Sequence, residues 1–192
     1  ITGLKISSDG RTLYSSGSAG KVLVSDLTGD RRLGQPLSTR SDDGRRLSSF
    51  DLSPDGRVLA VGHEDGTVSL IDVGTLRQIS TFPVVPDAPI VSLAFVPASH
   101  TLVVGGEGFL AGVDTGEGHR VTRFPGHRSA VFAPTISSDG RRMVTTNGTS
   151  AVMLWTLHSG RPQGRPRAYA PSAIVDLSLS PAGRCLAVLL AR

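Results

Sequence analysis

Residues 53–73 read SPDGRVLAVGHEDGTVSLIDV, a stretch in which two apolar runs each follow a turn sequence. Ser-Pro-Asp-Gly precedes the run VLAVG, and Glu-Asp-Gly precedes the run TVSLID. Short apolar runs that alternate with polar residues and are bounded by Gly, Pro and Asp are typical of β-strands joined by tight turns. With the apolar residues Phe50 and Leu52 just before it, the stretch predicts three consecutive strands of one antiparallel sheet.

The same plan returns along the whole chain. The position of Pro54 is taken elsewhere by Ser8, Pro97, Ser138 and Pro181, at spacings of 41 to 46 residues. Each copy has apolar alternation before and after this turn, then a second turn and a third apolar run. A short polar segment such as RQISTF follows the third run and predicts a fourth strand. A regular period of this length indicates a repeat architecture with one four-stranded unit per repeat.

The repeats resemble a WD40 array over essentially the whole chain. Gly126-His127 matches the Gly-His pair of that family, Trp155-Thr156 matches its Trp-Asp pair, and DGTVSLID (65–72) matches its turn and third strand. The resemblance implies an all-β fold, a WD40-like β-propeller of four-stranded antiparallel blades. We expect about four blades plus part of a fifth, at approximately 1–40, 41–84, 85–125, 126–170 and, incomplete, 171–192.

The resemblance also implies structural roles for single residues. Blades of this family contain a hydrogen-bonded network of Asp, His, Ser or Thr, and Trp, and the matching positions here are His127, Trp155, Asp65 and Asp72. No blade carries all four types, since Asn147-Gly148 replaces the turn aspartate of one blade and another lacks the tryptophan. Because a buried polar network fixes a core only when it is complete, we expect these blades to depend on aliphatic packing.

The segments LTGDRRLGQP (27–36) and LHSGRPQGRP (157–166) share a turn, cations and a Gly-x-Pro ending. This sequence pattern is similar to that of degenerate WD40 arrays of bacterial type, which often lie downstream of signalling ATPase modules. No phosphate-binding loop of the Gly-x-x-x-x-Gly-Lys type is present in this chain. A ring of the usual seven blades needs roughly 300 residues. We therefore expect a partial propeller belonging to a longer chain, and a small ring completed by self-association is the alternative.

Composition restricts the class of protein further. The 192 residues are 39% hydrophobic and carry a net charge of +4. Almost all the positive charge comes from arginines spread singly or in pairs, which argues against a surface that follows a nucleic acid. The single cysteine, Cys185, excludes a disulfide framework and predicts a buried thiol. No apolar run approaches the length of a membrane span, and the start of the chain lacks a signal peptide. We expect a soluble cytoplasmic protein without a membrane partner.

Catalytic and metal-binding patterns are weak. The five histidines stand in different turns, and none has a partner at metal-ligand or triad spacing. GGEGFLAG (105–112) has dinucleotide-like glycines but no following helix pattern. We expect no catalytic residue, metal or cofactor, with a hydrolase or oxidoreductase propeller and an arginine-mediated nucleic-acid module as alternatives. RPQGRPR (161–167) is the densest basic segment and is interpreted as a proline-stiffened surface strand, with a contact for an acidic partner or phosphate as the alternative.

The functional prediction is a non-catalytic scaffold or sensor that binds a partner protein, or another domain of the same longer signalling or regulatory chain. Loops held by rigid strands carry recognition in such folds. In WD40 geometry one face consists of the turns between second and third strands and of the loops leading into each blade. The residues expected on this mixed-charge face are Ser18, His63, Glu64, Glu107, Asn147 and Thr149 from the turns, and Arg45, Asp87 and Arg128 from the loops.

Overall fold

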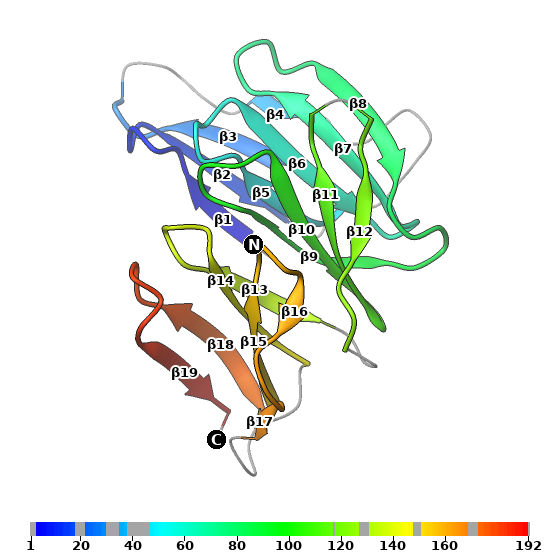
Figure 1. The fold of residues 1–192 in the computed structure, drawn as a ribbon. Helices are drawn as coiled ribbons and strands as arrows, with labels where there is room; N and C mark the ends of the chain where they lie inside the picture. Colours follow the sequence, from blue (N-terminus) through cyan, green and yellow to red (C-terminus); the bar gives the residue numbers. More distant parts are fainter. Residues whose placement is uncertain are drawn as a thin grey trace. The chain divides into compact units, whose positions relative to one another are not determined.

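The computed structural model of the chain describes residues 3–17, 22–29, 35–37, 47–116, 118–126, 131–147, 151–168 and 173–191. In these residues every regular element is a β-strand (Figure 1). None of the described segments forms a helix with the length and apolarity that a bilayer crossing requires. The chain divides into two compact units, residues 1–90 and 91–192.

The first unit contains two four-stranded antiparallel sheets whose strands neighbour one another in chain order. The first sheet consists of β1 (Gly3–Ile6), β2 (Thr12–Ser16), β3 (Val22–Asp26) and β4 (Gln35–Leu37). The second consists of β5 (Leu47–Leu52), β6 (Val58–His63), β7 (Thr67–Asp72) and β8 (Gln78–Pro83).

The second unit repeats this plan. One sheet consists of β9 (Ile90–Phe95), β10 (Thr101–Gly106), β11 (Phe109–Asp114) and β12 (Val121–Arg123). The next consists of β13 (Phe132–Ile136), β14 (Arg142–Thr146), β15 (Ala151–Thr156) and an outer strand in two pieces, β16 (Arg161–Pro162) and β17 (Arg167–Ala168), both of which pair with β15. A final hairpin consists of β18 (Ile174–Leu179) and β19 (Leu186–Leu190). The prediction of an all-β fold made of four-stranded antiparallel blades is confirmed.

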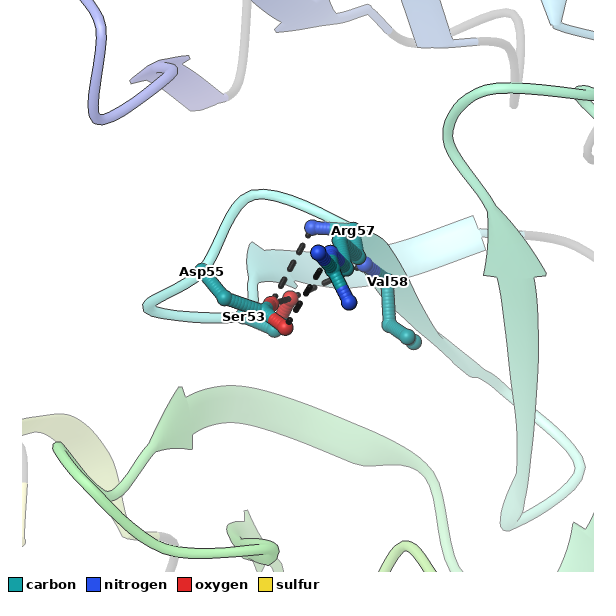
Figure 2. Close-up of polar contacts among 4 residues, drawn as sticks. All are labelled: Ser53, Asp55, Arg57 and Val58. Atoms are coloured by element: carbon teal, nitrogen blue, oxygen red, sulfur yellow. Dashed lines mark hydrogen bonds and ion pairs between the residues drawn. The ribbon is translucent and has the colours of Figure 1, made fainter.

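A hydrogen-bonded turn joins β5 to β6 (Figure 2). The Ser53 hydroxyl donates to Asp55 Oδ1 at 2.6 Å and accepts the amide of Val58 at 2.9 Å, while Asp55 Oδ1 also accepts the amide of Arg57 at 3.1 Å. Gly56 completes the turn at φ 72°, a conformation that glycine adopts without strain. Ser53 thereby accepts the first amide of β6 and fixes the residue at which β6 starts.

The same arrangement recurs in two further blades. The serine-to-aspartate hydrogen bonds measure 2.5 Å for Ser7 with Asp9 and 2.6 Å for Ser137 with Asp139. In the β18–β19 hairpin Ala182 replaces the aspartate, yet the Ser180 hydroxyl still accepts the amide of Cys185 at 3.0 Å. The serine is thus the part of the turn that all four of these hairpins retain.

The cores are largely aliphatic, as the incomplete polar networks led us to expect. In the first unit one cluster joins β2 and β3 to β5–β7, and its buried members are Tyr14, Val22, Phe50, Leu59, Val61 and Ile71. In the second unit Trp155 is fully buried among Val103, Leu110 and Met143. The ring of Phe124 lies 6.0 Å from that of Trp155, centroid to centroid.

Replacing Ser53 by alanine should destabilise the first unit. The change removes the acceptor of the Val58 amide and a donor to Asp55, and lost hydrogen bonds of this kind cost about 0.5 to 1.5 kcal/mol each. We expect the free energy of unfolding in urea to fall by about 1 to 2 kcal/mol. Arg57→Ala is the matched control, because its side chain is 84% exposed and its ion pair with Asp55 is long, at 4.0 Å. Equal losses for the two variants would contradict this role of Ser53.

The charge of Asp55 should make the turn sensitive to acid. The hydrogen bond from Ser53 and then that from the Arg57 amide hold the pKa of Asp55 below its ordinary value of 3.8. A pKa that is lower in the folded state stabilises the protein above the unfolded pKa, and this contribution is lost as the pH falls through the folded pKa. In urea titrations at several pH values, the stability difference between the wild type and Asp55→Asn should stay level above about pH 5 and shrink below about pH 4. A difference that persists unchanged in strong acid would rule this contribution out.

Candidate protein-binding face

Antiparallel pairing puts the turns of each blade at two ends. In the sheet β5–β8, the β5–β6 and β7–β8 turns share one end, while the β6–β7 turn and the loop that leaves β8 share the other. We call residues 64–66 of the turn and residues 84–88 of the loop the ledge. Of the residues predicted on the recognition face, Glu64 and Asp87 lie on the ledge, and His63 immediately precedes it.

Backbone hydrogen bonds fasten the two halves of the ledge to each other. The amides of Val84 and Val85 donate to the carbonyl of Gly66 at 3.0 and 3.4 Å, and the amide of Asp87 donates to the carbonyl of Asp65 at 3.3 Å. The contact is close because position 66 has no side chain: a Cβ there would lie 1.9 Å from the Val85 carbonyl oxygen. Gly66 also has φ 81°, so both the space and the backbone conformation require glycine.

The exposed groups of the ledge are acidic. Glu64 and Asp87 are exposed, and neither forms an ion pair within the described residues. Asp87 sits at φ 60°, a left-handed conformation that aspartate tolerates better than most residues. Asp65 has a different role, because its Oδ1 accepts the amide of Thr67 at 3.0 Å and the Thr67 hydroxyl at 2.6 Å. Its carboxylate closes the turn, whereas those of Glu64 and Asp87 face solvent.

His63 does not belong to the exposed face on which the sequence placed it. Its side chain is fully buried, and Nε2 lies 2.9 Å from the hydroxyl of Ser69, which lies 2.7 Å from the hydroxyl of Thr81. The chain turns after His63, so the His63 ring is buried while the Glu64 side chain is exposed to solvent. This line of polar groups links β6, β7 and β8 beneath the ledge.

The second unit uses a similar construction at its β10–β11 turn. Glu107 is exposed at the tip of this turn, and the amide of Val131 donates to the carbonyl of Gly106 at 3.1 Å. The carbonyl of Val131 in turn accepts the hydroxyl of Ser92 at 2.9 Å. The segment leading into β13 is thereby held against the turn that carries Glu107.

The remaining predicted residues have varied positions. Trp155 is buried, and its Nε1 donates to the hydroxyl of Thr145 at 2.9 Å. Asp72 closes the β7–β8 turn: hydrogen bonds from the Thr75 hydroxyl and amide, both 2.7 Å, lower its pKa. Asn147 is half-buried after β14. Five predicted residues lie outside the part of the chain that the structure describes: Ser18, Arg45, His127, Arg128 and Thr149.

Sequence reasoning missed the polar core residues Ser69, Thr81 and Thr145. Ser69 stands between two apolar residues of its strand, and Thr81 and Thr145 each have one apolar neighbour. Ser69 and Thr145 are buried to more than nine-tenths. A serine or threonine at an inward position of an apolar strand was the available signal, because such a group must find a hydrogen-bond partner. As for a metal centre, no three His, Cys, Asp or Glu side chains of the described ranges gather closely enough to hold an ion.

Comparisons with known proteins agree with this fold. The sequence profile of the family described as the WD40 domain of anaphase-promoting complex subunit 4 matches residues 19–98. An uncharacterized WD repeat-containing protein of Schizosaccharomyces pombe is 22% identical over 80% of this chain and 37% of its own length. A WD repeat-containing protein of Schistosoma mansoni is 24% identical over 84% of this chain and 52% of its own length. The chain thus spans roughly a third to a half of these two relatives.

Solved structures show the same fold at low identity. A chain of the mitotic checkpoint complex crystal structure superposes with a TM-score of 0.84 at 21% identity, over 98% of this chain and 56% of that one. A chain of hydrazine synthase from Kuenenia stuttgartiensis gives 0.82 at 23% identity, over 97% and 54%.

Four-stranded antiparallel blades repeated along one chain define a β-propeller protein. The profile match over residues 19–98 and the WD repeat-containing relatives support a WD40-repeat family for this chain. Propellers of this family generally mediate protein–protein interactions.

Gly66→Ala tests whether the ledge depends on this glycine. The added Cβ must push the β8–β9 loop away and the backbone must keep a left-handed φ, and strain of this kind costs about 1 to 3 kcal/mol. We expect a loss of at least about 2 kcal/mol in urea unfolding, together with faster amide exchange at Val84 and Val85. Gly74→Ala is the control, since its Cβ would meet only Asp72 Oδ1, at 3.5 Å. Unchanged exchange at the two valines would disprove the fastening.

Proposed function

We propose that the chain is a non-catalytic protein-interaction module that binds a basic surface of a partner protein through the ledge. The observation that carries the proposal is the pair of exposed carboxylates, Glu64 and Asp87, on two segments fastened by backbone hydrogen bonds. We also propose that the module works as a scaffold or sensor within a longer regulatory protein.

Rigidity supports a recognition role for the ledge. Ordering a loop on binding costs free energy, and a loop that is already ordered avoids that cost. Three backbone hydrogen bonds join the turn to the loop, and the buried line from His63 through Ser69 to Thr81 lies beneath them. Glu64 and Asp87 therefore project from a preorganised base.

The charges of the ledge indicate the chemistry of the partner. The third carboxylate, that of Asp65, is engaged with Thr67, so Glu64 and Asp87 are the two left to meet cations. Exposed charges steer association and select partners more than they add affinity. A partner with lysine or arginine at the matching positions should associate faster at low ionic strength than at high.

The WD repeat-containing relatives support the non-catalytic part of the proposal, because proteins of this family are typically scaffolds without enzymatic activity. His63, which immediately precedes the ledge, is fully buried and hydrogen-bonded to Ser69. The likeness to a hydrazine synthase chain is a likeness of fold at 23% identity.

Reversing the ledge charges should weaken capture of the partner. We expect immobilised wild-type chain to retain at least one protein from an extract of the source cells, and Glu64→Arg/Asp87→Arg to retain about tenfold less of it, equal to ~1.4 kcal/mol. Quantitative mass spectrometry of the retained proteins measures the difference.

Arg77→Glu is the matched control for this experiment. Arg77 is exposed in the β7–β8 turn, at the other end of the same blade, so its reversal changes the charge of the chain without touching the ledge. Retention of the same proteins in the same amounts by the double variant, with its fold intact by circular dichroism, would refute the proposal.

A further inference from the structure

A groove lies between the sheet β9–β12 and the sheet β13–β17, at the end of the blades that carries the turns between first and second strands. It consists of two adjoining cavities of about 470 and 480 Å³, which share Thr101, Phe124, Leu157 and His158 in their lining. One wall comes from the start of β10, the end of β11 and the β11–β12 turn, and the other from the β13–β14 and β15–β16 turns. Both sheets have their first to fourth strands, and the groove lies wholly within the second unit.

The groove is a feature of the repeat, because an equivalent cavity of about 610 Å³ lies within the first unit, where the β7–β8 turn meets the sheet β1–β4. In the sheet β1–β4, Thr12 pairs with Asp26, and both residues line that cavity. In the sheet β9–β12, Thr101 pairs with Asp114 at the corresponding place, and both line the groove. The groove is therefore open because of how one sheet meets the turn of the next, at a place where both sheets are present.

The groove of the second unit differs from its counterpart in charge. Its titratable side chains among the described residues are those of His100, Arg120, Arg141, His158 and one acid, Asp114. The four basic side chains are exposed, and none forms an ion pair within the part of the chain that the structure describes. Asp114 Oδ1 accepts the amide of Gly116 at 2.9 Å, so this oxygen belongs to its own turn. The cavity of the first unit has one arginine and two aspartates instead, Arg11, Asp9 and Asp26.

Backbone hydrogen bonds hold three of the basic residues in the walls of the groove. The carbonyls of His100, Arg120 and Arg141 accept the amides of Thr115, Asp114 and Leu157 at 2.8, 3.0 and 3.0 Å, respectively. The hydroxyl of Thr115 also donates to the carbonyl of His100, at 2.8 Å. Because the main chain of the walls is already ordered, a ligand would not have to pay for ordering it.

An apolar floor lies between the basic walls. Phe124 lines both cavities, and Gly112 and Gly160 leave room for its ring, since a Cβ at these positions would lie 3.1 Å from Cζ and 2.9 Å from Cδ1. Val96 and the half-buried Leu157 extend the floor. Phe124 is only 9% exposed, so a nucleotide base would find too little of the ring to stack on. An aliphatic side chain suits such a floor better.

We propose that the groove binds an acidic peptide segment of a partner protein, with an aliphatic side chain over Phe124 and Leu157 and carboxylates on Arg120 and Arg141. Charge complementarity carries the proposal: a guanidinium group presents a planar fork of donors that matches a carboxylate, and clusters of arginine are a known means of binding acidic motifs. The groove lies within residues 91–192 and the ledge within residues 1–90, so neither proposal depends on the other.

Labelled peptides test the proposal on the 192-residue chain. The first probe is a fluorescein-tagged Glu-Asp-Leu-Glu-Asp peptide, the second has Gln and Asn for the acids, and the third has Ala for Leu. In fluorescence anisotropy we expect the first peptide to bind most tightly. The neutral peptide should bind at least about tenfold more weakly than the first, and the alanine peptide several-fold more weakly.

Charge reversal locates the site. Arg120→Glu/Arg141→Glu should weaken binding of the acidic peptide at least about tenfold. Arg11→Glu/Arg123→Glu is the matched control, because it changes the net charge equally: Arg11 lines the equivalent cavity of the first unit, and Arg123 is exposed on β12 without lining the groove. Glu64→Arg should leave peptide binding unchanged, which separates a failure here from a failure of the ledge. Circular dichroism checks that each variant is folded.

The histidines of the groove supply a second readout that needs no substitution. His100 and His158 are exposed and line the same cavity. Diethyl pyrocarbonate acylates accessible imidazoles, and mass spectrometry of the digested protein measures the reaction at each histidine. Bound acidic peptide should slow the reaction at both residues, and the neutral peptide should not.

Four outcomes would overturn the proposal. One is the absence of binding of the acidic peptide to folded protein. Another is an equal loss of binding in the control Arg11→Glu/Arg123→Glu, which would mean non-specific attraction. A third is peptide binding that leaves the reaction of His100 and His158 unchanged, which would put the site elsewhere. The last is tighter binding of a single-stranded oligonucleotide, lost in Arg120→Glu/Arg141→Glu, which would assign the groove to nucleic acid.

Discussion

In four of the blades, a serine hydroxyl in the turn between the first and second strands fixes the register on which the blade depends. Ser53 meets the amide of Val58 and the carboxylate of Asp55 at once, and Ser7 and Ser137 do the same in their blades. Side chains alternate between the two faces of a strand, so a slip of one residue would move every apolar side chain to the wrong face. Because β6 starts correctly at Val58, Leu59 and Val61 enter the core and the strand reaches His63 in the position where Ser69 can bond its ring. The exposed turn therefore determines what the opposite end of the blade can present.

The two ends of a blade use their carboxylates differently. At the serine end the aspartates accept hydrogen bonds within their own turns, which lowers the pKa of Asp9, Asp55 and Asp139. At the other end the Asp65 carboxylate also accepts hydrogen bonds within its own turn, but the Glu64 carboxylate beside it accepts no hydrogen bond from the described residues. A carboxylate committed to a turn stabilises the fold and has little left for a partner, whereas one left in solvent contributes little to stability. This division suits a module that keeps its frame and varies the tips of its turns.

The sequence predicted the blades well and the sites less well, for physical reasons. Period, turn residues and strand alternation are local properties, so the four-stranded sheets could be predicted without knowing how they pack. The positions of Glu64 and Glu107 followed from the same turns. His63 and Cys185 could not be placed by pattern alone, because burial depends on which side of a turn a residue falls and on what covers it. Cys185, which the sequence predicted to be a buried thiol, is exposed. The hydrogen bond from Arg142 Nη1 to the carbonyl of Gly183 was further out of reach, because the two residues are 41 positions apart in the chain and meet only through packing.

The interrupted outer strand of the sheet β13–β17 shows how a blade protects its exposed edge. An outer strand exposes unpaired backbone groups, and proteins commonly protect such edges with proline, a bulge or a single charge. Between the pairs Trp155–Pro162 and Val152–Arg167, two residues of β15 face four residues of the outer segment. Pro162, Pro166 and this bulge, in which Gly164 has φ 77°, provide that protection, so the basic segment 161–167 serves the fold as a proline-stiffened surface strand.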